Sequence, residues 1–141
     1  MGSAKSLYAK MLRSLLTDNM IWIDHVDHGS EELVAAYSRA RLFASVSWAE
    51  GASLSLLEAC AAGLPLIAHD TGSEREYFGD EPIYVRASDI DDIRSQVSEV
   101  FHREAGTCAG NAIATKYSWD SHVSKISGLY SMLINTESKS K

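Results

Sequence analysis

The sequence predicts an α/β protein, with a Rossmann-like parallel sheet and helices on both of its faces. Short apolar runs alternate along the chain with segments whose apolar residues recur at helical spacing. Strands separated by helices form βαβ units, and such strands are apolar because helices cover both faces of a parallel sheet. The chain has no internal repeat and no linker rich in proline or glycine. We therefore expect a single domain over residues 1–141.

The composition is that of a globular protein. Of the 141 residues, 45% are hydrophobic and 23% are charged, so the chain can bury a core without disulfides or metals. Its 13 basic and 19 acidic side chains give a net charge of −6, which argues against nucleic acid or anionic lipid as a partner. No apolar run approaches the ~20 residues of a transmembrane segment. Cys60 and Cys108 are typical of reduced thiols, so we expect a cytoplasmic protein.

The first part of the chain predicts two helices and two strands. Leucines recur at helical spacing over 6–16, and the apolar run 21–23 predicts a strand. Ser30 is followed by two acids and then by an apolar face, which predicts a helix that begins there. Residues 42–46 predict the second strand.

The rest of the chain continues this alternation. Gly63 ends a predicted helix, because the left-handed conformation that follows many helices suits glycine. The predicted elements are a helix over 54–62, a strand over 65–68, a polar loop over 69–76, a strand over 83–85, a helix from 88, and helical residues over 102–134 with a break near 116–118.

The loop over 47–53 is the main candidate for a binding site. Ligands of parallel sheets bind beyond the carboxyl ends of the strands, and this loop follows the second strand and runs directly into a helix. Its small residues leave the backbone amides accessible, and the helix N-terminus adds about half a positive charge. Together these features suit a phosphate group. The loops over 24–30 and 69–76 are the other candidates.

Two carboxylates flank this turn: Glu50 and, after seven intervening residues, Glu58. An ionised carboxylate only accepts hydrogen bonds, which suits the hydroxyl groups of a ribose or another sugar. Glu58 has a structural alternative, because Ser55-Leu56-Leu57-Glu58 is a capping-box pattern. Glu50 has one as well, as a solvated loop residue. The residues alone leave these alternatives open.

The stretch from Glu50 to Ala68 resembles the signature of the retaining GT-B glycosyltransferases, family four. That family has a Glu-x7-Glu motif followed by a small-residue helix, a Gly-x-Pro turn, a strand that ends near an aspartate and, close to the chain end, an aromatic-Ser-Trp element. The resemblance spans about 21–134. The chain matches these elements at Glu50 and Glu58, Gly63-Leu64-Pro65, Asp70 and Tyr117-Ser118-Trp119.

The resemblance implies a part in glycosyl transfer. It implies the C-terminal, donor-binding half of a GT-B fold, with the opening strand of that half missing and the N-terminal acceptor domain absent. The donor would be a nucleotide-diphosphate sugar, with no other cofactor and no metal. The acceptor, a glycan, a lipid or a small molecule, would bind the missing domain. The full-length enzyme would transfer a hexosyl group with retention of configuration, in the cytoplasm or at the cytoplasmic face of a membrane, and this chain alone would be inactive.

The resemblance also implies roles for individual residues. Glu50 resembles the family glutamate beside the donor sugar, which orients the sugar or takes part in the displacement itself, so Glu50 is the candidate catalytic residue. Glu58 resembles the glutamate that binds the donor ribose. The donor-binding residues that the resemblance implies are Glu50, Gly51, Ala52, Ser53, Leu54 and Glu58.

Some positions depart from the family pattern. Ala52 and Ser53 stand where Phe and Gly are typical, although Ser53 fits if it caps the helix. No Lys or Arg near the motif clearly replaces the basic residues that meet the diphosphate in the family. Arg75, in the loop over 69–76, could reach a phosphate or lie in solvent. A function of a different class therefore stays open: a non-catalytic α/β module that binds a nucleotide or a protein.

Overall fold

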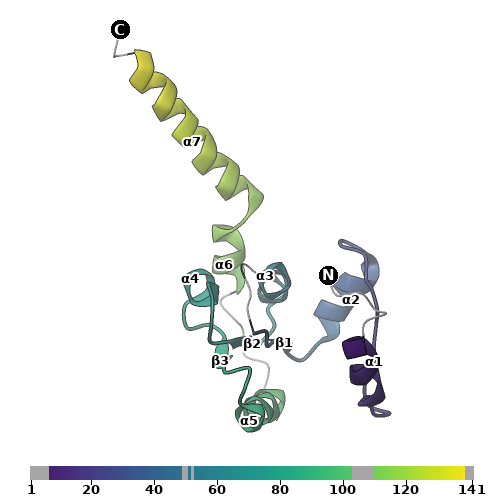
Figure 1. Cartoon of the computed structure of the whole chain (residues 1–141). Coiled ribbons are helices and arrows are strands. Elements are labelled where there is room, and N and C mark those ends of the chain that lie inside the picture. The colour runs from purple at the N-terminus through teal and green to yellow at the C-terminus, as the bar shows by residue number, and fades with distance from the viewer. Residues whose placement is uncertain (1–6, 49–50, 52, 103–109, 139–141) are drawn as a thin grey trace. The chain divides into compact units, whose positions relative to one another are not determined.

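Three short parallel strands form the sheet, in the order β1 (Phe43–Ser45), β2 (Leu66–His69) and β3 (Ile83–Val85). The computed structural model describes residues 7–48, 51, 53–102 and 110–138, and Figure 1 shows their helices and strands. A helix follows each strand: α3 (Leu54–Ala61) after β1, α4 (Glu74–Phe78) after β2 and α5 (Ile90–His102) after β3. The predicted α/β, Rossmann-like fold is confirmed.

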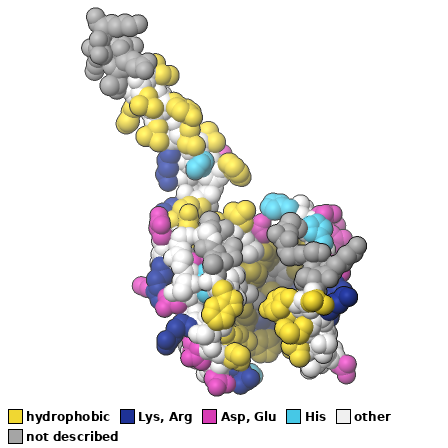
Figure 2. Space-filling model, in the orientation of Figure 1, with side chains coloured by type: hydrophobic (Ala, Val, Ile, Leu, Met, Phe, Trp, Pro, Cys, Tyr) yellow, Lys and Arg dark blue, Asp and Glu magenta, His cyan; other side chains and the backbone are white. Residues whose placement is uncertain are grey.

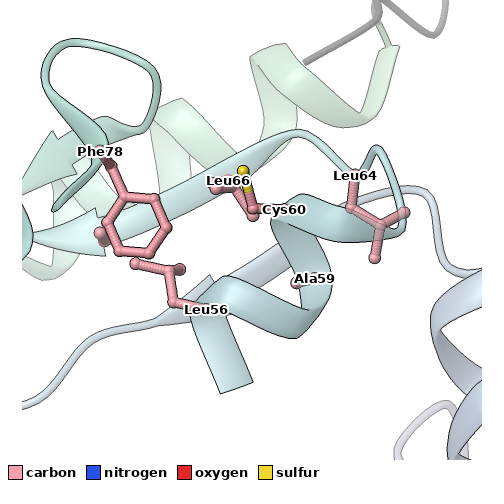
Figure 3. Close-up of a cluster of buried hydrophobic side chains, with 7 residues drawn as sticks. Leu56, Ala59, Cys60, Leu64, Leu66 and Phe78 are labelled. Atoms are coloured by element: carbon pink, nitrogen blue, oxygen red, sulfur yellow. The ribbon is translucent and has the colours of Figure 1, made fainter. Parts of the chain in front are cut away.

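The two faces of the sheet carry separate hydrophobic clusters, because successive residues of a strand point to opposite sides. On one face, Leu66 and Ala68 pack against α3, and Phe78 of α4 completes the cluster (Figure 3). On the other face, Ile67 packs with Val85 and with Val100 of α5. Helices therefore cover both faces of the sheet, as the sequence predicts.

The chain divides into two compact units, residues 1–36 and 37–141, and the boundary falls within α2 (Glu31–Arg39). The first unit also contains α1 (Leu7–Ser14). The predicted start of α2 is confirmed, because the hydroxyl of Ser30 accepts a hydrogen bond from the Leu33 amide at 3.2 Å. That residues 1–141 form a single domain stays a prediction.

The predicted strand over 21–23 is wrong. These residues form no strand, and the side chains of Ile21 and Ile23 are mostly exposed. Local side-chain contacts hold the segment instead: the Trp22 indole donates to Asp24 at 2.8 Å, and the Arg13 guanidinium pairs with Asp24 and lies over the Trp22 ring. A run of three apolar residues becomes a strand only where a neighbouring strand takes up its backbone hydrogen bonds, and its sequence cannot show that neighbour.

Later in the chain, the structure has one helix, α4, that the sequence did not predict, and α5 begins at Ile90 and not at 88. Helix α4 begins at Glu74, inside the segment predicted as a polar loop over 69–76, because its buried Phe78 anchors a short turn of polar residues to the core. The left-handed residue after α3 is confirmed at Gly63, with φ +78°. The break near 116–118 is also confirmed, since it separates α6 (Gly110–Lys116) from α7 (Trp119–Ser138).

Helix α7 exposes apolar side chains along its length (Figure 2). No helix within residues 7–48, 53–102 and 110–138 is long and apolar enough to span a bilayer. The exposed apolar side chains of α7 are Trp119, Val123, Ile126, Leu129, Tyr130, Met132, Leu133 and Ile134.

The fold predicts how two neighbouring leucines of α3 differ. Leu56 is fully buried, so Leu56→Ala should lower the free energy of unfolding by about 2–5 kcal/mol through the cavity that it leaves. The matched control is Leu54→Ala on the same helix, where the side chain is 66% exposed, and it should change that free energy by less than about 0.5 kcal/mol. Denaturant unfolding measures both. Equal losses for the two variants would contradict the assignment of Leu56 to the core.

Candidate functional site

The candidate site lies where the loop after β1 runs into α3. Ser53 is the N-cap of this helix: its backbone is extended (φ −79°, ψ 97°), and its hydroxyl accepts a hydrogen bond from the Leu56 amide at 3.3 Å. This confirms that Ser53 fits its position as a cap, although glycine is typical there in the family that the sequence resembles. The Ser53 side chain is buried, so the start of α3 is fixed against the core.

The position of this cap decides one alternative for Glu58. A capping box needs the glutamate three residues after the cap, and that position is taken by Leu56, since the cap is Ser53. Glu58 lies further along the helix, so the interpretation of Ser55-Leu56-Leu57-Glu58 as a capping box is wrong. The half-buried carboxylate of Glu58 has a different set of contacts.

Tyr37 of α2 holds the Glu58 side chain. Its hydroxyl donates a hydrogen bond to Oε2 of Glu58 at 3.0 Å and lies 3.3 Å from the carbonyl oxygen of Ser55. The Tyr37 ring packs against Phe43 of β1. Burial, and then the hydrogen bond to Glu58 and its negative charge, raise the pKa of Tyr37 to about 12. The phenol therefore stays protonated around neutral pH and remains a donor to the carboxylate.

Sequence reasoning missed Tyr37 as a site residue. In the sequence it belongs to the apolar face of the helix that begins after Ser30, and its ring does pack in the core as that pattern indicates. Its hydroxyl is the part that reaches Glu58, and an apolar pattern gives no signal for the partner of a phenol. The only available sign was that a buried tyrosine needs a hydrogen-bond partner.

The turn between β2 and α4 meets the loop after β1. The hydroxyl of Ser73 donates a hydrogen bond to the carbonyl oxygen of Gly51. Ser73 is the N-cap residue of α4, but its side chain makes no capping bond to that helix. Two of the three loops that the sequence singles out are thus brought together, as expected for turns at the carboxyl ends of neighbouring parallel strands.

Arg75 is engaged by carboxylates. Its Nε and Nη2 atoms each lie 2.9 Å from Oδ1 of Asp70, and Nη1 lies 3.4 Å from Oδ1 of Asp80. The guanidinium also lies over the ring of Tyr84, 4.0 Å from its centroid. The guanidinium of Arg75 is therefore already paired with carboxylates in this structure. That Arg75 reaches a phosphate stays a prediction.

The structure describes only some of the remaining predicted site residues. Glu50 and Ala52 lie outside the described residues, so their roles stay predictions. Gly51 and Leu54 are described and exposed, and the role of their amides in binding a donor also stays a prediction. Within residues 7–48, 51, 53–102 and 110–138, no three His, Cys, Asp or Glu side chains come together as metal ligands would.

Comparison with known proteins shows the family of the chain. The sequence profile of the family described as Glycosyl transferases group 1 matches residues 2–118. The chain is also similar to the O-antigen chain mannosyltransferase B of Escherichia coli, with 29% identity over 117 residues. That match covers 79% of this chain and 31% of the relative, so the chain spans less than a third of the relative's length. No solved structure matches the chain. The extent of the profile match shows the family: the chain belongs to the group 1 glycosyltransferases.

Proposed function

We propose that this chain is the donor-binding part of a retaining GT-B glycosyltransferase. It binds a nucleotide-diphosphate sugar, and the full-length enzyme transfers the sugar to an acceptor hydroxyl with retention of configuration. The observation that carries the proposal is the junction of β1 and α3. This junction lies at the carboxyl edge of a parallel sheet, where ligands of such sheets bind. It contains the exposed Gly51, the helix start capped by Ser53, and Glu58, whose carboxylate accepts a hydrogen bond from Tyr37.

The diphosphate is proposed to bind at the start of α3. The helix N-terminus carries about half a positive charge, and backbone amides there point toward an anion. The Leu56 amide is occupied by the Ser53 hydroxyl, so the amides that face the diphosphate are those of the preceding segment, Gly51 to Leu54. Arg75 is paired with Asp70, and Arg41 lies over the ring of Phe101. These two arginines are therefore already engaged by other side chains, and we expect weak affinity.

The ribose is proposed to bind Glu58. An ionised carboxylate accepts hydrogen bonds from the ribose hydroxyls, and charge-assisted bonds of this kind are the stronger ones. The Tyr37 hydroxyl holds Oε2 and so limits the rotamers of the glutamate before the ligand arrives. A carboxylate that is already oriented loses less conformational entropy when it binds, which favours affinity.

The sugar is proposed to face Glu50, as the catalytic residue. The similarity to a mannosyltransferase supports a mannosyl group as the sugar, and the acceptor, a glycan, a lipid or a small molecule, is proposed to bind outside this chain. The mechanism needs no cofactor besides the donor. The isolated chain is proposed to be inactive, because transfer needs the acceptor as well.

Glu58→Ala should weaken nucleotide binding by about 1.5–3 kcal/mol, because a charge-assisted hydrogen bond to the ribose is lost. Tyr37→Phe should weaken it less, by about 0.5–1.5 kcal/mol, because only the orienting bond is removed. Calorimetric titration of the chain with ADP, GDP and UDP measures these losses. Asp120→Ala on the exposed start of α7 is the matched control and should leave affinity unchanged.

Two results would contradict this assignment. If Glu58→Ala lowers the melting temperature but leaves the affinity unchanged, Glu58 is a structural residue and not a ligand for ribose. If the unaltered chain binds none of the three nucleotides, the chain is not a donor-binding part, and the alternative of a protein-binding α/β module is favoured.

Glu50→Gln tests the proposed catalytic residue in the full-length enzyme. Glutamine keeps the size of the side chain but removes the charge that favours an oxocarbenium-like transition state, so kcat should fall at least a hundredfold, about 2.7 kcal/mol of barrier. The donor KM should change little, because the interaction strengthens only in the transition state. Steady-state kinetics with a labelled donor separate the two constants. A raised KM with unchanged kcat would make Glu50 a positioning residue, and no change in either constant would make it a solvated loop residue.

A further inference from the structure

A buried pair of polar side chains lies next to the proposed site. His69 ends β2, Glu74 begins α4, and the Nε2 atom of the imidazole is 3.4 Å from Oε2 of the carboxylate. The two residues are only 1% and 2% exposed. Neither ring nitrogen of His69 and neither carboxylate oxygen of Glu74 has a hydrogen-bond partner among the described residues. Each side chain is therefore the other's electrostatic partner.

Burial without other partners makes this pair hard to separate. Taking an imidazole and a carboxylate out of water is costly, and the cost is offset only while the two groups face each other. Moving Glu74 away would leave two uncompensated polar groups in the core. The pair therefore fixes the first residue of α4 relative to the last residue of the central strand.

Fixing Glu74 also fixes its neighbour Ser73. Ser73 does not use its hydroxyl to cap α4 and donates it to the carbonyl oxygen of Gly51 instead. On the other side of the turn, the Asp70 amide donates to the Val85 carbonyl of β3 at 2.9 Å, which holds the first residue of the turn to the sheet. The turn from Asp70 to Ser73 is thus held at both of its ends.

We infer that the buried His69–Glu74 pair is a positioning element for the donor loop. It holds the turn after β2 so that the Ser73 hydroxyl fixes the Gly51 carbonyl, and in this way it sets the position of Gly51, one of the residues proposed to face the sugar and diphosphate. His69 and Glu74 act through Ser73 and touch no ligand themselves. The inference rests on the proposed function for its effect on binding, and on the structure alone for its effect on Gly51.

Two variants should have the same effect if this inference is right. Ser73→Ala removes the bond to Gly51 directly. His69→Leu combined with Glu74→Met removes the pair but keeps apolar volume in the core, a replacement that buried pairs often tolerate. Each should shift the carbonyl ¹³C signal of Gly51 in the same direction in the free chain. Each should also raise the Kd of the tightest-binding nucleotide among ADP, GDP and UDP about three- to tenfold, the range for one lost hydrogen bond.

Combining the three substitutions distinguishes positioning from general loosening of the core. Because both changes act through the Ser73–Gly51 bond, the triple variant should bind no more weakly than the weaker-binding of its two parents. Asp91→Asn, which breaks the exposed pair between Asp91 and Arg94 on α5, is the control and should change neither the signal nor the Kd.

Three results would overturn the inference: additive losses in the triple variant, an unchanged Gly51 signal in the His69→Leu, Glu74→Met chain, or a shift opposite to that of Ser73→Ala. If the double variant does not fold, Glu74→Gln replaces it, since glutamine keeps the size of the side chain but puts a neutral amide in place of the carboxylate that faces His69. It should move the Gly51 signal in the same direction by a smaller amount, and no movement would again overturn the inference. If no nucleotide binds the unaltered chain, the proposed function fails, while the Gly51 signal still decides the role of the pair.

Discussion

Burial of β2 on both faces is the constraint on which the rest of the structure depends. Leu66 and Ala68 need a helix on one side of the sheet and Ile67 needs one on the other, which α3 and α5 provide. A helix follows each strand and returns the chain to the same starting edge, and because the strands are parallel they all end at the opposite edge. The turns after β1 and β2 meet there, and the bond from Ser73 to Gly51 joins them.

At this edge, polar contacts between segments give the candidate site its form. The start of α3 is set by its Ser53 cap, and the Glu58 carboxylate is held by a tyrosine from α2. A helix N-terminus alone is common among α/β proteins and identifies no ligand. The combination with an oriented, half-buried carboxylate is what supports a ligand that carries both phosphate and hydroxyl groups, and a nucleotide-diphosphate sugar has both.

The sequence was sufficient wherever a regular pattern or a local cap determines the structure. The alternation of strands and helices, the start of α2 and the glycine after α3 are all local features. The start of α3 was not determined in this way, because both Ser53 and Ser55 fitted a cap and the structure decides for Ser53. The sequence failed for residues 21–23, because a short apolar run does not show whether a neighbouring strand exists. It also gave no sign of the Tyr37–Glu58 bond or the His69–Glu74 pair, since each is made by side chains that only the fold brings together.

The most direct test of the central claim is where a nucleotide binds. Titration of the ¹⁵N-labelled chain with the tightest-binding nucleoside diphosphate, followed by amide chemical shifts, locates the site residue by residue. The account predicts the largest shifts at Gly51, at Ser53 to Glu58 and at Ser73, with α5 and α7 unaffected. Shifts confined to α5 or α7, with the amides from Gly51 to Glu58 unchanged, would contradict it.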